Sequence, residues 1–305
     1  MNRILIVSLI ILAAVPTDGN AQKSPDNNQK TVLVTGASSG IGRKITERLT
    51  ADGYFVFASA RKEADLQALG ALPNVQAVRL DVTKPEDIDA AVETVMKAGR
   101  GLYGLVNNAG IATVGPLIDT KPEEFDAVMK VNVYGPYLMS KAFAPLIVAH
   151  HGRIVNIGSI SGILNSPSAG AYQMSKHAME TFSVTLAKEL TPSGVQVSLI
   201  EPGSYKSDIF KNEVNRSGTG AQLVDRWATL KEPDDVAAAV EAALSEPKTK
   251  QRYMVVPDQE QVEETIKAQL EQLVQINEGQ QYTYDRTTLI KMLDAALAGA
   301  RPRSK

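Results

Sequence analysis

The chain has no cysteine and only three histidines among its 305 residues. Without cysteine there can be no disulfide framework, no thiolate nucleophile and no cysteine metal ligand. His150, His151 and His177 lack the spacing of zinc ligands, so we expect them to be structural or exposed and predict no metal site. The formal net charge of −2 gives no reason to expect a nucleic acid partner.

Hydrophobic runs long enough to span a bilayer are also lacking. The apolar segment from Ile4 to Val15 is short; it follows Arg3 and precedes small residues that end at Ala21. This pattern is typical of a secretory signal peptide over residues 1–21, which predicts an exported, periplasmic or otherwise extracytoplasmic protein. The alternative is an uncleaved membrane anchor with the domain left in the cytoplasm. We expect residues 22–30 to be a disordered leader.

Short runs rich in β-branched residues alternate with helical patterns of ten or more residues through most of the chain. The alternation predicts one α/β domain over residues 31–257, a doubly wound, Rossmann-type parallel sheet with flanking helices. One long helix is expected from 122 to about 150, and a mobile flap over 204–231. Residues 258–305 carry two amphipathic patterns, expected as a helical extension packed on the domain or at a subunit interface. The expected strands are 31–35, 54–59, 75–80, 102–106, 153–157, 195–200 and 252–256.

A glycine-rich turn follows the first expected strand and precedes a helical pattern. Glycines at such a turn allow close approach of a pyrophosphate, whose charge suits the N-terminus of the helix. The spacing is G-x-x-x-G-x-G rather than the commoner G-x-G-x-x-G. The turn predicts a dinucleotide site formed by Gly36, Ser38, Ser39, Gly40, Ile41 and Gly42.

The end of the second expected strand bears on the choice of dinucleotide. NAD-selective sites usually place an acidic residue here, to hold the ribose hydroxyls. This chain has Ala60 followed by Arg61 and Lys62, and these cations suit the additional phosphate of NADP. We therefore predict NADP(H) as the preferred cofactor, with NAD(H) possible. The alternative is that both cations are solvated charges at the start of the next helix.

Ser159, Tyr172 and Lys176 form the candidate catalytic set. A phenol has an unperturbed pKa of about 10, and a nearby ammonium group favours the phenolate. Residues four apart share a helix face, so Tyr172 and Lys176 can converge, and Ser159 could donate a hydrogen bond to the same substrate oxygen. This set predicts proton transfer to or from an alcohol or carbonyl. Tyr137 and Lys141 repeat the spacing without the serine, and we interpret them as an ordinary helix surface.

Several candidate residues share one position in the expected fold. In open α/β sheets, ligands bind beyond the carboxyl ends of the strands. The residues that fall at such ends are Gly36, Arg61, Asp81, Asn108, Ser159 and Pro202. Their agreement predicts one site at this edge of the sheet.

The motifs TGASSGIG, LDVT, NNAG, VNVYG, YQMSK and EPG, with Ser159, stand in the order typical of the short-chain dehydrogenase/reductase family. The resemblance covers residues from about 30 to 257. GLYGLVNNAG, VSLIEPG and the long C-terminal tail resemble its retinol and hydroxysteroid dehydrogenase-like branch. The resemblance implies an NAD(P)-dependent oxidoreductase that interconverts an alcohol and a ketone or aldehyde on a lipophilic substrate, and a homodimer or homotetramer. The alternative is a non-catalytic NADP-binding sensor or scaffold on the same fold.

The resemblance also implies roles for individual residues. Tyr172 would be the general acid/base, Lys176 would lower its pKa and hold the nicotinamide ribose, and Ser159 would orient the substrate carbonyl. Asn132 would position a water that links Lys176 to a proton relay. Further cofactor contacts would come from Asp81 at the adenine, Asn108 in the cleft, Pro202 and Gly203 at the nicotinamide, and Ser207 in place of the threonine common in the family.

Overall fold

The computed structural model describes residues 29–218 and 221–300. The predicted signal peptide or anchor over 1–21 and the leader up to residue 28 lie outside the described residues. Among the helices that the structure does describe, none combines the length and the apolar character needed to cross a bilayer.

The core of the molecule is a sheet of seven parallel strands in the order β3-β2-β1-β4-β5-β6-β7. The strand order reverses between β1 and β4, which is where such sheets form a ligand crevice. β-branched residues dominate the central strands, because these strands are buried on both faces. The strands are β1 (Thr31–Val34), β2 (Phe55–Ala60), β3 (Val75–Arg79), β4 (Gly104–Asn107), β5 (Arg153–Ile157), β6 (Gln196–Pro202) and β7 (Arg252–Val255). The predicted doubly wound α/β fold is confirmed, and each predicted strand is present within two residues of its expected bounds.

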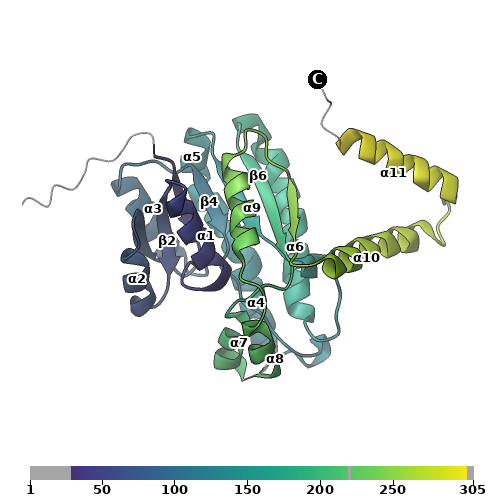
Figure 1. Ribbon diagram of the computed structural model, residues 1–305, viewed down its shortest axis with the longest axis horizontal. Coiled ribbons are helices and arrows are strands. Elements are labelled where there is room, and N and C mark those ends of the chain that lie inside the picture. Colours follow the sequence, from purple (N-terminus) through teal and green to yellow (C-terminus); the bar gives the residue numbers. More distant parts are fainter. Residues whose placement is uncertain (1–28, 219–220, 301–305) are drawn as a thin grey trace, which may run out of the picture.

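Helices cover both faces of the sheet (Figure 1). One face packs against α1 (Gly40–Ala51), α2 (Glu63–Gly70) and α9 (Asp234–Ser245), which bury residues such as Ile45, Leu69 and Val240. The other packs against α3 (Pro85–Lys97), α5 (Gly135–Ala149) and α6 (Gly170–Leu190), with Ile88 and Phe143 at its centre. These two cores hold the strand ends in fixed positions.

The single helix predicted for residues 122–150 is interrupted. The structure has α4 (Pro122–Met129), a π-helical turn (Lys130–Tyr134) and then α5. Pro136 has no backbone N–H and cannot donate to the carbonyl of Asn132, four residues earlier, so an α-helical ladder would lack one hydrogen bond at this point. The wide turn places Asn132 inside the protein, with 2% of its surface exposed.

The predicted flap contains two short helices, α7 (Ile209–Ser217) and α8 (Ala221–Ala228). The rings of Phe210 and Trp227 pack together with their centroids 4.6 Å apart. Arg216 of α7 forms an ion pair with Glu124 of α4 and donates a hydrogen bond to the carbonyl of Ala112 over 2.7 Å. The flap is therefore tied to the loop that follows β4.

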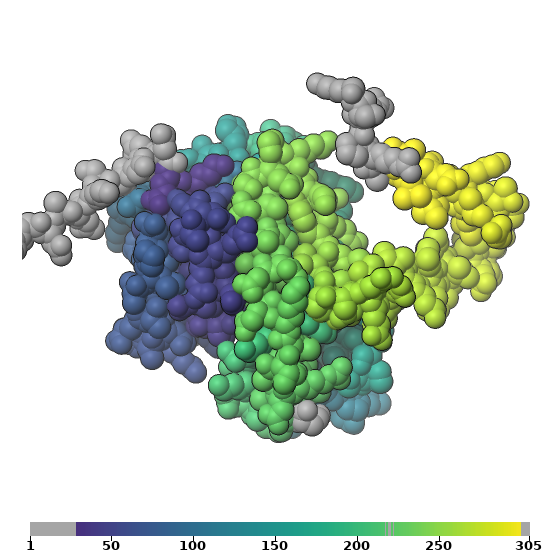
Figure 2. Space-filling model, in the orientation of Figure 1, coloured from purple at the N-terminus to yellow at the C-terminus, as the bar shows by residue number. Residues whose placement is uncertain are grey.

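The C-terminal extension is helical, as predicted, and forms α10 (Gln259–Asn277) and α11 (Arg286–Ala300). One face of α10 lies against the body, where Thr265 is buried. α11 instead projects away from the sheet and its helices (Figures 1 and 2). Packing of the extension on the domain is thus limited to α10.

Candidate active site

Because all seven strands are parallel, their carboxyl ends lie at one edge of the sheet. The loops that leave these ends carry most of the candidate residues, and α6 adds Tyr172 and Lys176. The structure therefore places these candidate residues at one edge of the sheet.

Ser159 lies directly after β5 and caps a 3-10 turn (Ile160–Gly162). Its Oγ accepts a hydrogen bond from the backbone N–H of Ser161 over 3.0 Å and donates to the carbonyl of Pro202 over 3.4 Å. The hydroxyl is thus held between the ends of β5 and β6, and it also shares a side-chain hydrogen bond with Tyr172.

Lys176 is held inside the protein, with 6% of its surface exposed. Its Nζ donates a hydrogen bond to the carbonyl of Ile157 over 2.8 Å and lies 5.6 Å from the centre of the Tyr172 ring. The two residues share one face of α6, as their spacing predicts. Ser159, Tyr172 and Lys176 are therefore brought together from β5 and α6.

Burial governs the proton affinities of this group. It raises the pKa of Tyr172 to about 12, while the hydrogen bond with Ser159 acts in the opposite direction. Burial also lowers the pKa of Lys176 to about 8. We expected Lys176 to lower the pKa of Tyr172, but in this geometry the loss of solvation of the phenolate is the larger effect. At neutral pH Tyr172 holds its proton.

The side chain of Asn132 is fully engaged with its neighbours. Its Nδ2 donates to the carbonyl of Ile111 and to Oγ of Ser175, each over 2.9 Å, and its Oδ1 accepts from the N–H of Ile111 over 2.9 Å. A Cβ atom on Gly110 would lie 3.5 Å from Oδ1 of Asn132 and 3.9 Å from Nζ of Lys176. Asn132 thus borders the same space as Lys176. Its hydrogen bonds fix the loop after β4 to the π-helical turn and to α6.

The glycine turn forms a cradle in which side chains would not fit. Gly36 has φ of +63°, and a Cβ atom there would lie 2.9 Å from Cα of Ala109. A Cβ on Gly42 would overlap the carbonyl of Gly36 and Nδ2 of Asn108. Asn108 braces the turn, because its Nδ2 donates to the carbonyls of Thr35 and Gly36 over 2.9 and 3.0 Å. A backbone exposed in this way at the start of α1 fits a pyrophosphate group.

The side chains of the glycine turn differ in their contacts and exposure. Ser39 is the N-cap of α1 and makes no side-chain capping bond, whereas Ile41 packs against the core and Ser38 is exposed. A Cβ on Gly40 would lie 3.3 Å from Cβ of Ser207, so the start of the flap lies beside the turn.

Arg61 and Asp81 lie together where β2 and β3 end. Nη1 of Arg61 is 3.9 Å from Oδ2 of Asp81, and the Arg61 side chain is 65% exposed. Asp81 accepts two hydrogen bonds from Thr83, one from its N–H and one from its hydroxyl. Partial burial acts to raise the pKa of Asp81, but these bonds and the charge of Arg61 outweigh it and the pKa is lowered. Arg61 is thus a largely exposed cation that lies beside the Asp81 carboxylate.

Pro202 and Gly203 are braced by a residue that sequence reasoning did not identify. Oε1 of Gln261, at the start of α10, accepts a hydrogen bond from the N–H of Ser204 over 2.8 Å. A Cβ atom on Gly203 would lie 2.4 Å from the same oxygen. The link spans 57 positions in sequence, and no motif signals it.

A second group that sequence reasoning did not identify lies next to the turn that follows Ser159. Arg252 of β7 pairs with Glu201 through Nε over 2.9 Å, and its Nη2 reaches Glu180 of α6 over 2.6 Å. Burial, followed by the charge of Glu201, raises the pKa of Glu180 to about 8, although Arg252 acts in the opposite direction. A Cβ on Gly162 would lie 2.8 Å from Oε1 of Glu180, so this cluster supports the turn after Ser159.

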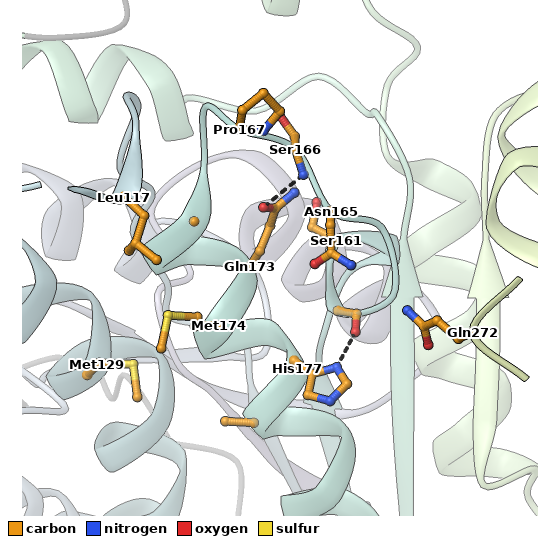
Figure 3. Close-up of a pocket in the computed structure, with 13 residues that line it drawn as sticks. Leu117, Met129, Ser161, Asn165, Ser166, Pro167, Gln173, Met174, His177 and Gln272 are labelled. Atoms are coloured by element: carbon orange, nitrogen blue, oxygen red, sulfur yellow. Dashed lines mark hydrogen bonds between the residues drawn. The ribbon is translucent and has the colours of Figure 1, made fainter. Parts of the chain in front are cut away.

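Within residues 29–218 and 221–300, no group of three or more histidine, cysteine, aspartate or glutamate residues could hold a metal ion. A groove of about 1100 Å³ lies beside α6, and its lining residues do not include Ser159, Tyr172 or Lys176 (Figure 3). Met174 and Ala178 line it from the other face of the helix, so the groove is separate from the catalytic set.

Comparison with known proteins identifies the family of this chain. A family model described as short chain dehydrogenase matches residues 30–218. The uncharacterized oxidoreductase YbbO of Escherichia coli is 34% identical over 232 residues, which cover 74% of this chain and 86% of that protein. The 3-ketoacyl-(acyl-carrier-protein) reductase of Brucella melitensis, solved with NADH, is 28% identical with a TM-score of 0.67, covering 74% and 96% of the two chains.

A metagenomic short-chain oxidoreductase solved in complex with NADP is 31% identical, has a TM-score of 0.62, and covers 75% of this chain and 98% of its own. The family model spans more than half of the sequence and includes the glycine turn, Ser159, Tyr172 and Lys176. The chain therefore belongs to the short-chain dehydrogenase/reductase family of oxidoreductases.

Proposed function

We propose that this protein interconverts a lipophilic alcohol and the corresponding ketone or aldehyde, with NADP(H) as the preferred cofactor and NAD(H) as a possible one. The observation that carries the proposal is the convergence of Ser159, Tyr172 and Lys176 at the carboxyl edge of the sheet. The nicotinamide supplies or accepts the hydride. The protein has to orient the substrate and move one proton.

Each member of the set has a separate task. The Ser159 hydroxyl turns from its long 3.4 Å bond with the carbonyl of Pro202 to donate its proton to the substrate oxygen, which it then orients. Tyr172 gives its proton to that oxygen during reduction, because the pKa of about 12 keeps the phenol protonated at neutral pH. Lys176, when protonated, stabilises the phenolate that remains. Asn132 holds the loop after β4 in place around Lys176.

The preference for NADP is supported by Arg61. Its side chain is exposed just after β2, and its guanidinium group lies 3.9 Å from Asp81, the residue expected to contact the adenine. Guanidinium groups bind phosphates in a bidentate manner, and no carboxylate occupies the position of Ala60. A lipophilic substrate is proposed from the resemblance of GLYGLVNNAG and VSLIEPG to the retinol and hydroxysteroid dehydrogenase-like branch.

The proposal is tested by fluorescence titration of the purified protein with NADPH and with NADH, followed by a screen of lipophilic ketones and aldehydes with the nucleotide that binds. Tight NADPH binding, weaker NADH binding and turnover of at least one apolar carbonyl compound are expected. The reverse nucleotide preference would contradict the role of Arg61. Nucleotide binding without turnover of any carbonyl or alcohol would favour the sensor or scaffold.

A further inference from the structure

The C-terminal extension begins at the edge of the sheet where the candidate site lies. Only residues 256–258 separate β7 from α10, which then runs outward from the body (Figure 1). Because β7 pairs with β6 and runs parallel to it, the first turn of α10 lies next to the loop that leaves β6. That loop contains Pro202 and Gly203, the residues expected to contact the nicotinamide. The start of the extension is therefore close to the expected position of the reacting ring.

Gln261, in the first turn of α10, joins the extension to this loop. Its Oε1 accepts a hydrogen bond from the N–H of Ser204 over 2.8 Å. The same oxygen fills the space beside Gly203, because a Cβ atom on this glycine would lie 2.4 Å from it. The N–H of Gly203 donates to the carbonyl of Val255 in β7 over 2.8 Å. Gln261 therefore holds the residue that directly follows the two expected nicotinamide contacts.

Asp258 determines which end of the Gln261 amide faces the loop. Oδ2 of Asp258 accepts a hydrogen bond from Nε2 of Gln261 over 2.6 Å, and its Oδ1 accepts from the backbone N–H of Gln261 over 3.0 Å. A carboxylate can only accept hydrogen bonds, so the amide nitrogen must face Asp258, and the amide oxygen is left for Ser204. The hydroxyl of the buried Thr265 donates to the carbonyl of Gln261 over 2.7 Å and holds the same turn.

The position of the loop also affects Ser159. The carbonyl of Pro202 lies 3.4 Å from Oγ of Ser159, and Gly203 is the one residue between Pro202 and Ser204. A shift of Ser204 would therefore reach both the nicotinamide and the serine that orients the substrate. A misplacement of about 1 Å in a reacting group can lower the rate about 100-fold. Support from α10 is thus expected to act on the rate of hydride transfer.

We propose that Gln261, oriented by Asp258, is a positioning residue that holds Pro202 and Gly203 against the nicotinamide during hydride transfer. The inference rests on the proposed function, because it requires a nicotinamide in the cleft. Gln261 acts through Ser204, the residue that its amide oxygen binds. The C-terminal extension would in this way take part in the reaction.

An exchange of donor and acceptor between positions 258 and 261 tests the contact. In Gln261→Glu alone the introduced carboxylate would face the carboxylate of Asp258. In Asp258→Asn alone the introduced amide has one oxygen for the two N–H groups that Asp258 now binds. The double variant places an amide donor opposite a carboxylate acceptor and leaves an oxygen for Ser204. Gln261→Ala removes the acceptor, and Gln259→Ala, exposed in the same turn, is the matched control.

Hydrogen exchange of the Ser204 amide measures the contact without a cofactor or a substrate. We expect faster exchange in Gln261→Ala and in each single exchange variant, because the N–H of Ser204 loses its acceptor or holds it less well. The double variant and Gln259→Ala should protect this amide as the wild type does. Wild-type protection of Ser204 in Gln261→Ala would overturn the proposal.

Turnover with saturating NADPH and an accepted carbonyl substrate measures the effect on the reaction. The kcat of Gln261→Ala should fall roughly 10- to 100-fold, while its dissociation constant for NADPH stays within about threefold of the wild type, since the glycine turn is unchanged. The double variant should recover most of the rate, and Gln259→Ala should keep all of it. An unchanged kcat, a rise in KM alone, or a double variant as slow as Gln261→Ala would overturn the positioning role.

A failure of the proposed function would give a different result. A wild-type chain that binds NADPH but turns over no carbonyl or alcohol would contradict that function alone. The fluorescence of bound NADPH would then decide the role of Gln261, because the emission comes from the nicotinamide. The emission should change in Gln261→Ala and return in the double variant, whereas identical emission from all variants would overturn the proposal. A chain that binds neither NADPH nor NADH would contradict both.

Discussion

Lys176 of α6 donates a hydrogen bond from Nζ to the carbonyl of Ile157, the last residue of β5, over 2.8 Å. The bond fixes the amine beside the strand that delivers Ser159. It also holds a basic group at a position where burial lowers its pKa to about 8. The site therefore keeps a cation at a cost in folding free energy, and this cost can be measured.

Replacement of Lys176→Met should stabilise the fold while removing activity. Between pH 8 and about 10.5 the unfolded chain binds a proton that the folded chain has released, so the contribution of Lys176 to stability rises with pH over this range. Below pH 8 the full cost is present. We expect the variant to gain about 1–3 kcal/mol in free energy of unfolding at pH 7, less at pH 10, by chemical denaturation. A loss of stability that is equal at both pH values would contradict this account.

Arg61→Ala should weaken the binding of NADPH and leave NADH nearly unaffected. A guanidinium-phosphate pair contributes about 1.5–3 kcal/mol, so the dissociation constant for NADPH should rise roughly 10- to 100-fold. Nucleotide fluorescence titration measures both constants. Lys97→Ala, which removes an exposed cation from α3, is the matched control and should change neither. An equal loss for both nucleotides would mean that Arg61 supports the fold of the site rather than the phosphate.

The Glu180, Glu201 and Arg252 cluster gives a prediction with the opposite pH dependence. Because the pKa of Glu180 is raised to about 8, the folded chain binds a proton between about pH 4.5 and 8 that the unfolded chain has released, and stability falls as pH rises through this range. Gln at this position keeps a neutral group of the same shape. Glu180→Gln should therefore match the wild type at pH 5 and exceed it by about 1–3 kcal/mol at pH 8.

Thermal unfolding across pH 5–8.5 tests this expectation. Glu189→Gln, an exposed position on the same helix, is the control and should follow the wild-type curve. If Glu180→Gln is less stable than the wild type at pH 8, Arg252 must hold Glu180 as a carboxylate. That result would contradict the raised pKa of Glu180.

The sequence was sufficient for the features that depend on local patterns. Apolar runs and glycine turns predicted the parallel strands, and the four-residue spacing of Tyr172 and Lys176 predicted their common face. These features depend on residues near one another in the chain, or on the shared direction of parallel strands. The carboxyl-edge site follows from that direction alone.

Features that depend on distant contacts were not predictable in the same way. The raised pKa of Tyr172 depends on how completely the phenol is buried, which no spacing reveals. Gln261 reaches Ser204, and Arg252 reaches Glu180, only because the sheet brings β6, β7 and the start of α10 together. The π-helical turn at Asn132 was not predicted, because we expected one continuous helix from 122 to about 150 and the residues of the turn carry no local pattern that marks it.

The measurement closest to the central claim is the rate of hydride transfer by Tyr172→Phe saturated with NADPH and an accepted carbonyl substrate. Tyr137→Phe serves as the control, because Tyr137 and Lys141 share the spacing but lie outside the catalytic set. We expect Tyr172→Phe to bind NADPH within about threefold of the wild type and to lose at least roughly 100-fold in turnover, as for loss of a general acid. The control should keep its full rate. Wild-type turnover by Tyr172→Phe would contradict the assignment of Tyr172 as the proton donor.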